Sequence, residues 1–190
     1  MKKTILFTAL MSLSLNFSIN QTANIDDAKT AIKQLADALQ AELKAAMQSG
    51  GPTAAIGVCN TRAMPITEKV SKQQGLQVSR VSLRNRNPAN APNDWQTAVL
   101  ENFQQQESDG KDVTTMTWSE TVDVGGGKEF RFMKAIPTGE VCLACHGTTL
   151  APEISGTLAE LYPRDRATGF SVGDIRGAFV VTRQFKKQMN

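Results

Sequence analysis

The chain has 190 residues, of which 41% are hydrophobic and 21% are charged, a composition typical of one globular domain. It contains one histidine, His146, and three cysteines, Cys59, Cys142 and Cys145. A single histidine excludes sites that need two from one chain, namely bis-histidine haem, Cys₂His₂ zinc and the 2-His-1-carboxylate iron triad. Three cysteines leave one over after any disulfide, so the odd cysteine needs a role of its own.

The formal net charge of +3 comes largely from the start of the chain. Lys2 and Lys3 are the only charged residues before Asn24, so the remainder has 19 basic against 18 acidic residues, or +1. A near-neutral protein gives no reason to expect nucleic acid or an anionic membrane surface as a partner.

Residues 1–23 are predicted to be a secretory signal peptide. Two lysines precede an apolar stretch over residues 4–19, and Gln21-Thr22-Ala23 offers a cleavage point. That stretch is shorter than the ~20 residues that a membrane span needs. A lipoprotein is not expected, because no cysteine lies near the cleavage point. We expect export to a bacterial periplasm, with no membrane span after cleavage, and free thiols do not persist there unless something occupies them.

Three segments predict helices before residue 75. The first, residues 24–47, has apolar residues at steps of three and four along one face, and Gly50-Gly51-Pro52 ends it. We expect a second helix over residues 53–62 and a third from Pro65 to Gln74.

After residue 75 the residue pattern predicts a sheet with one inserted helix. Residues 84–93 hold two prolines and four asparagines and predict an irregular loop, and residues 94–106 predict a helix. Apolar and polar alternation predicts strands over residues 76–83, 113–122, 129–136 and 177–182.

These elements predict an α+β fold, an antiparallel sheet with an N-terminal helical extension. We expect a single domain over residues 24–190, helical over 24–75 and sheet-like over 76–190. The pattern fits a PAS-like sheet, although alternation alone does not select that topology.

Cys142-Leu143-Ala144-Cys145-His146 is C-x-x-C-H, the attachment sequence for c-type haem. Two thiols at this spacing reach the two vinyl groups of one porphyrin, and the next residue brings an imidazole to the iron. The only histidine of the chain occupies the position that the motif requires, and c-type haem is attached outside the cytoplasm. The sequence therefore predicts one covalently bound haem c.

Three other readings use the same residues. Cys142 and Cys145 could be a thioredoxin-like redox pair, or a disulfide that braces a turn, with His146 incidental. Cys59, Cys142, Cys145 and His146 could instead form a Cys₃His zinc site, although such sites usually contain two cysteine pairs.

The second axial ligand of the iron cannot be histidine. The only methionine after the motif is Met189, at the chain end, whereas Met116 and Met133 fit the sheet. A four-helix c-prime cytochrome would be helical after its motif, which the prolines, glycines and final strand here contradict. Cys59 remains. It could be a buried thiol that packs as a small hydrophobe, but in an exported protein we expect it to be the ligand, and its thiolate would stabilise ferric iron.

The chain resembles the PAS-like single-haem c-type domains in which histidine and cysteine hold the iron. The shared segments are the first helix, Ala55–Asn60, Arg80–Ser82, Arg86–Pro92 leading to Trp95, Cys142–Gly147, Tyr162–Phe170 and Gly173–Gly177. The resemblance implies thioether bonds at Cys142 and Cys145, axial ligation by His146 and Cys59, and a PAS-like sheet. Gln96 departs from the acidic residue expected after Trp95. We do not expect the signalling role of relatives that carry an output domain to transfer directly.

Three arginines, Arg80, Arg84 and Arg86, lie beside the irregular loop. Haem propionates need cations or hydrogen-bond donors, so these side chains are candidate propionate partners, the alternative being a solvated loop. Arg164-Asp165-Arg166 is expected to be a turn with internal ion pairs.

We expect a periplasmic monohaem protein that exchanges single electrons with an unidentified redox partner protein, or that senses redox state, and not an enzyme, because both axial positions are filled. The alternative is a gas sensor in which Cys59 dissociates and carbon monoxide or nitric oxide binds. A peroxidase would need a distal acid–base group, and no second histidine exists.

Overall fold

The computed structural model describes residues 8–186, with side chains described from residue 21 onward. It is an α+β fold, built on a four-stranded antiparallel sheet with a long N-terminal helix. The first seven residues of the predicted signal peptide lie outside the described part, and the backbone of its remainder continues the long helix. None of the described helices combines the length and the apolarity that crossing a bilayer requires.

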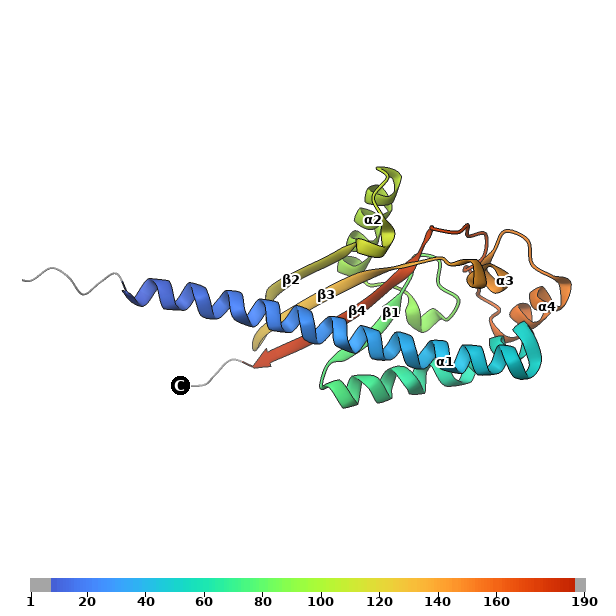
Figure 1. Ribbon diagram of the computed structural model, residues 1–190, viewed down its shortest axis with the longest axis horizontal. Helices are drawn as coiled ribbons and strands as arrows, with labels where there is room; N and C mark the ends of the chain where they lie inside the picture. The colour runs from blue at the N-terminus through green and yellow to red at the C-terminus, as the bar shows by residue number, and fades with distance from the viewer. Residues whose placement is uncertain (1–7, 187–190) are drawn as a thin grey trace, which may run out of the picture.

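The long helix α1 (Thr8–Gln74) folds back on itself (Figure 1). Its helical geometry breaks at Gly50 and Gly51, and Gly51 has φ 68°, a conformation open to glycine because it has no Cβ. The two arms are bridged by Gln74 to Gln34, at 2.8 Å, and by an Arg62–Glu42 ion pair at 3.2 Å. The break predicted at Gly50-Gly51 is therefore confirmed, and it makes a helical hairpin.

The second break, predicted before Pro65, is wrong. Pro65 lies inside α1 with helical backbone angles on both sides, although proline removes one helical hydrogen bond. The residues after it compensate by packing, since Ile66 and Val70 join the apolar cluster between the hairpin and the sheet. Tertiary packing holds the helix through a position that local propensity disfavours.

The sheet has the strand order β1-β4-β3-β2, all neighbours antiparallel. The predicted strands are confirmed with shifted ends, and residues 113–115 form a short 3-10 turn instead of a strand start. The elements after α1 are β1 (Gln77–Val81), α2 (Asp94–Ser108), β2 (Thr117–Val124), β3 (Gly127–Pro137), α3 (Leu143–His146), α4 (Pro152–Leu161) and β4 (Ile175–Lys186).

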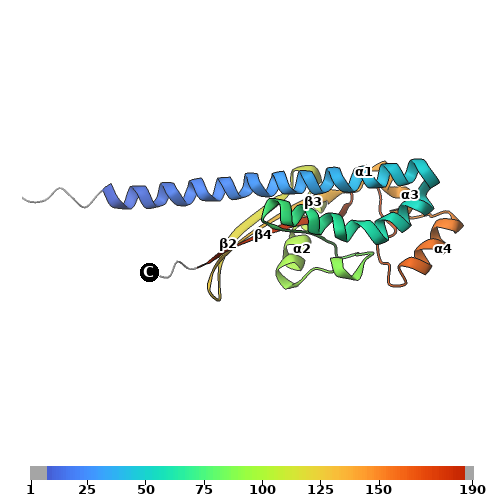
Figure 2. The ribbon, with the colours of Figure 1, turned by 90° about the horizontal axis from the view of Figure 1, so that it is seen from below.

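The sheet lies between the helical hairpin on one side and α2 on the other (Figure 2). Alternate residues of each strand face the two layers, so Phe130 and Phe132 pack under α1 while Met133 packs under α2. Phe103 of α2 is fully buried. Together α1, α2 and the four strands, apart from the strand ends at residues 80–81 and 175–176, form what we call the core body.

At one end of the sheet the chain leaves regular structure, near the turn of the hairpin (Figure 1). We call residues 80–93 and 138–176 the site end. It holds the C-x-x-C-H motif in α3 and also α4, a helix that the sequence analysis did not predict. Ile154 and Leu158 of α4 pack against Ile56 of α1 and thereby attach the site end to the hairpin.

Candidate functional site

The C-x-x-C-H motif forms a tight helical turn. A 3-10 turn (Glu140–Cys142) runs directly into α3, and the Gly147 N–H closes it by donating to the Leu143 carbonyl at 2.9 Å. A Cβ at Gly147 would lie 2.6 Å from that same oxygen. Only glycine fits here, and it sets the direction in which the chain leaves His146.

The imidazole of His146 is held by one hydrogen bond. Its Nδ1 lies 2.6 Å from the Ala167 carbonyl oxygen, which can only accept, so the proton of the neutral ring is on Nδ1 and Nε2 keeps its lone pair. Burial, with Arg176 and Arg86 nearby, lowers the pKa of His146 to about 3. A neutral imidazole with a bare Nε2 and a carbonyl behind Nδ1 is the form in which histidine ligates metals.

The loop that supplies Ala167 runs alongside the motif. The Phe170 N–H donates to the His146 carbonyl at 2.9 Å, and the Gly169 N–H donates to the Gly147 carbonyl at 2.8 Å. The Phe170 ring meets the imidazole edge to face, with centroids 6.3 Å apart. Backbone and ring contacts together fix the position of His146.

Arg86 is bonded within the protein. Its Nε pairs with Asp165 at 3.0 Å, and its Nη2 donates to the carbonyls of Cys145, at 2.5 Å, and Ala167, at 3.3 Å. Loop 84–93 lies against the loop after α4, where the Arg166 N–H donates to the Asn85 carbonyl. Arg86 thus bridges the two loops in the haem-free chain. One expectation is corrected, because Asp165 pairs with Arg86 and not with its neighbours in the turn.

The other two predicted arginines make no ion pair in the described part of the chain. The Arg84 guanidinium stacks on Phe170, 4.1 Å from the ring centroid. Burial lowers the pKa of Arg80, and the nearby Cys59 and Tyr162 oppose that shift. Arg80 is therefore a poorly hydrated cation without a carboxylate partner.

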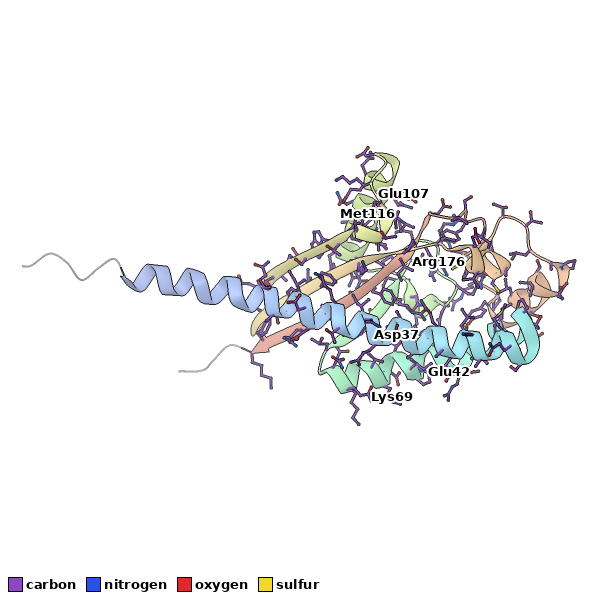
Figure 3. The ribbon with its side chains drawn as sticks, in the orientation of Figure 1. Asp37, Glu42, Lys69, Glu107, Met116 and Arg176 are labelled. Carbon is purple, nitrogen blue, oxygen red and sulfur yellow. The ribbon has the colours of Figure 1, made fainter. Side chains whose placement is uncertain are left out.

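Arg176 is a fourth cation of this group, which the sequence analysis did not identify. It lies at the start of β4, within the site end (Figure 3), and stacks 5.1 Å from the Phe170 centroid. Burial lowers its pKa to about 10, with Arg86 and Arg80 adding to the effect. Its segment, Gly173–Gly177, carries part of the family resemblance, but only the fold places this arginine beside the motif.

Cys59 lies on the second arm of α1, where the helix meets α4. The Asn60 side chain donates to the Leu161 carbonyl at 3.2 Å, and Ile56 shares an apolar cluster with Cys145. The Cys59 side chain is exposed, so it does not pack as a buried hydrophobe. Neighbouring atoms nevertheless desolvate its sulfur enough to raise the pKa of the thiol, against the charges of Arg80 and Arg86.

The three cysteines are free thiols in the structure, so no disulfide braces the motif. Burial, with Cys59 nearby, also raises the pKa of Cys145. Among the described side chains, no three His, Cys, Asp or Glu residues converge tightly enough to hold one metal ion. The Cys₃His zinc alternative, which needs all four ligands within about 2.3 Å of one ion, is therefore not supported.

The donor set fits a haem better than a lone ion. A haem iron takes one ligand on each face of a planar ring, and in a c-type haem two thiols would bond to the ring edge. Such a group requires a spread-out set of donors and cations near its carboxylates. His146, the exposed Cys59, the free thiols of the motif and several arginines without carboxylate partners meet those requirements.

Comparison with known proteins gave two matches and one negative result. The solved crystal structure of the cyanobacterial heme-protein Tll0287 is 27% identical and covers 88% of this chain and 98% of its own, with a TM-score of 0.62. No curated protein matches the chain. The family model described as Tll0287-like matches residues 17–183, a range that includes every site residue described above. The chain belongs to the Tll0287-like family.

Proposed function

We propose that this protein binds one haem c, through thioether bonds at Cys142 and Cys145. The observation that carries the proposal is the only histidine of the chain, which stands in C-x-x-C-H with Nδ1 bonded to a carbonyl and Nε2 bare. The similarity to a protein described as a heme-protein supports it. The haem would supply one-electron exchange between ferric and ferrous iron.

His146 and Cys59 are the proposed axial ligands. Nε2 of the neutral imidazole is available because Nδ1 carries the proton and donates a hydrogen bond to the Ala167 carbonyl. Cys59 is exposed, lies close enough to Cys145 for their charges to interact, and has Arg80 beside it. The Arg80 and Arg86 charges offset part of the desolvation that raises the pKa of the Cys59 thiol, and thiolate is the form that binds iron.

The propionates are assigned to Arg80, Arg84 and Arg176 in preference to Arg86. Arg80 and Arg84 have no carboxylate partner in the described chain, and Arg176 donates only to Ser82 and the Arg84 carbonyl. Arg86 is already bonded to Asp165. Two carboxylates brought into this group of cations would relieve the mutual repulsion of their guanidinium charges.

The biological role we propose is electron transfer or redox sensing by an exported protein of the periplasm, with a PAS-like fold. We propose cleavage before Asn24, which keeps in the mature chain the hydrogen bonds that Arg183 of the sheet donates to Asn24 and Asp27. With both axial positions filled the iron has no open site for a substrate, so we propose no catalytic activity.

The test is a pyridine haemochrome assay on the full-length protein expressed with a haem-attachment system. We expect one haem per chain, retained after acid–acetone extraction, and its loss in a Cys142→Ala/Cys145→Ala double variant. Exposed Thr148, changed to Ala, serves as the matched control and should retain haem. A wild type without haem that instead binds one zinc per chain would contradict the proposal.

Carbon monoxide separates the proposed role from gas sensing. Electron transfer with a retained Cys59 ligand predicts slow or absent carbon monoxide binding to the reduced protein. Rapid binding would favour the gas-sensing alternative, in which Cys59 dissociates on reduction. Cys59→Ser, which removes the thiolate, provides the fast reference rate.

A further inference from the structure

The peptide of Ala167 is held at both of its polar groups. Its carbonyl accepts from His146 Nδ1 at 2.6 Å and from Arg86 Nη2 at 3.3 Å. Its N–H donates to Asp165 Oδ1 at 2.7 Å. The Ala167 carbonyl, which accepts the hydrogen bond from His146, is therefore held in place by Arg86 and Asp165, the two members of one ion pair.

That ion pair is almost completely buried. The side chains of Arg86 and Asp165 are 11% and 10% exposed, and their Nε–Oδ2 distance is 3.0 Å. Withdrawing two charges from water cancels much of their attraction, so stability alone explains such a pair poorly. The remaining bonds of Arg86 are specific, because Nη2 reaches the carbonyls of Cys145, just before the histidine, and of Ala167, its acceptor.

We propose that Arg86 and Asp165 are positioning residues that set His146 in the Nδ1–H tautomer before any haem is bound. This inference rests on the proposed function, in which Nε2 binds iron. The Arg86–Asp165 pair, which we call the clamp, orients the Ala167 carbonyl toward Nδ1. The proton therefore stays on Nδ1, and Nε2 keeps its lone pair. A histidine released from the clamp would distribute its proton over both nitrogens.

The test reads the tautomer directly in the haem-free full chain. The protein has one histidine, so a two-bond ¹H–¹⁵N spectrum of the ¹⁵N-labelled protein contains a single imidazole. In wild type we expect Nδ1–H. In Arg86→Gln and Asp165→Asn we expect the ratio of Nδ1–H to Nε2–H to fall about tenfold, the effect of losing one charge-assisted hydrogen bond.

Two further variants keep the result interpretable. Arg164→Gln removes an exposed arginine next to Asp165 and should leave the tautomer as in wild type. If Arg86→Gln does not fold, Arg86→Lys retains the charge near Asp165 but cannot reach both carbonyls, and it should still shift the ratio. Nε2–H in wild type, or an unchanged tautomer in a folded Arg86 variant, would overturn the clamp. A wild type that shows Nδ1–H but takes up no haem would overturn the proposed function alone.

Discussion

The core body and the site end are held together by different interactions. In the core body, apolar side chains from two helical layers cover both faces of the sheet, and its ion pairs range from exposed, as in Lys33–Asp37, to largely buried, as in Arg131–Glu129. In the site end, α4 packs on α1 through a small apolar cluster, Leu83 and Ile175 reach the cluster under α2, and arginine side chains bond to backbone carbonyls. The core body supplies stability, and the site end supplies the exact positions of a few donor atoms.

The core body should give the largest loss of stability and no change at the site. Phe103→Ala removes a fully buried ring between α2 and the sheet, and we expect a loss of about 3–5 kcal/mol in the free energy of unfolding. Urea denaturation of the haem-free protein measures it. Val141→Ala, at a side chain that is 68% exposed, should change it by less than about 0.5 kcal/mol. A shift of the His146 tautomer in folded Phe103→Ala would mean that the two regions are not separable.

Breaking the buried ion pair between Arg86 and Asp165 should change both the stability of the protein and the tautomer of His146. Arg86→Gln leaves the Asp165 carboxylate without its cation, and we expect a loss of about 3 kcal/mol in the free energy of unfolding. Urea denaturation of the two single variants and of the double variant Arg86→Gln/Asp165→Asn tests whether the unpaired buried charge causes the loss. The double variant, which has no unpaired charge, should recover part of the stability. A double variant less stable than either single variant would contradict that explanation.

The pKa of His146 should make stability depend on pH. The folded pKa is lowered to about 3 from an ordinary value near 6.5, so the unfolded chain binds more protons between these values. This contribution is complete above pH 6.5 and is lost as the pH falls toward 3. From pH 7 to pH 5 we expect a decrease of about 2 kcal/mol, measured by urea denaturation of the haem-free protein. His146→Asn should remove this decrease; an equal slope in that variant would assign it to other groups.

Two glycines of the site end should respond in opposite directions. Gly147→Ala places a Cβ against the Leu143 carbonyl, and we expect a loss of about 1–2 kcal/mol together with poorer haem attachment. Gly156→Ala, inside α4 with open space around it, should increase stability by about 0.5–1 kcal/mol. Thermal unfolding of the two variants, compared with wild type, shows whether each substitution raises or lowers stability. Equal effects would show that the turn after His146 is not sterically restricted.

The same division explains which features could be predicted from sequence. Helical and strand periodicity predicted the elements of the core body, because burial on one face repeats along the chain. Helix α4 was missed because Gly156 and its polar neighbours weaken a ten-residue pattern, although Pro152 and Glu153 at its start are helix-start signals. The motif identified His146, Cys142 and Cys145 locally.

The partners of the motif could not be found in this way. Arg86 and Asp165 lie 79 residues apart in the chain, and Arg176 carries no sequence mark that ties it to His146. Such contacts depend on how β1, β4 and the loop after α4 meet in space. The arginine cluster in the sequence therefore indicated the region of the motif but not the ion pair between Arg86 and Asp165.

The electron paramagnetic resonance spectrum of the ferric full-length protein, compared with that of Cys59→Ser, tests the proposed haem site most directly. Iron held between a thiolate and an imidazole should give a low-spin signal of the thiolate type in wild type. That signal should disappear in Cys59→Ser while haem remains attached at Cys142 and Cys145. An identical low-spin signal in the two proteins would contradict the assignment of Cys59 as the second ligand.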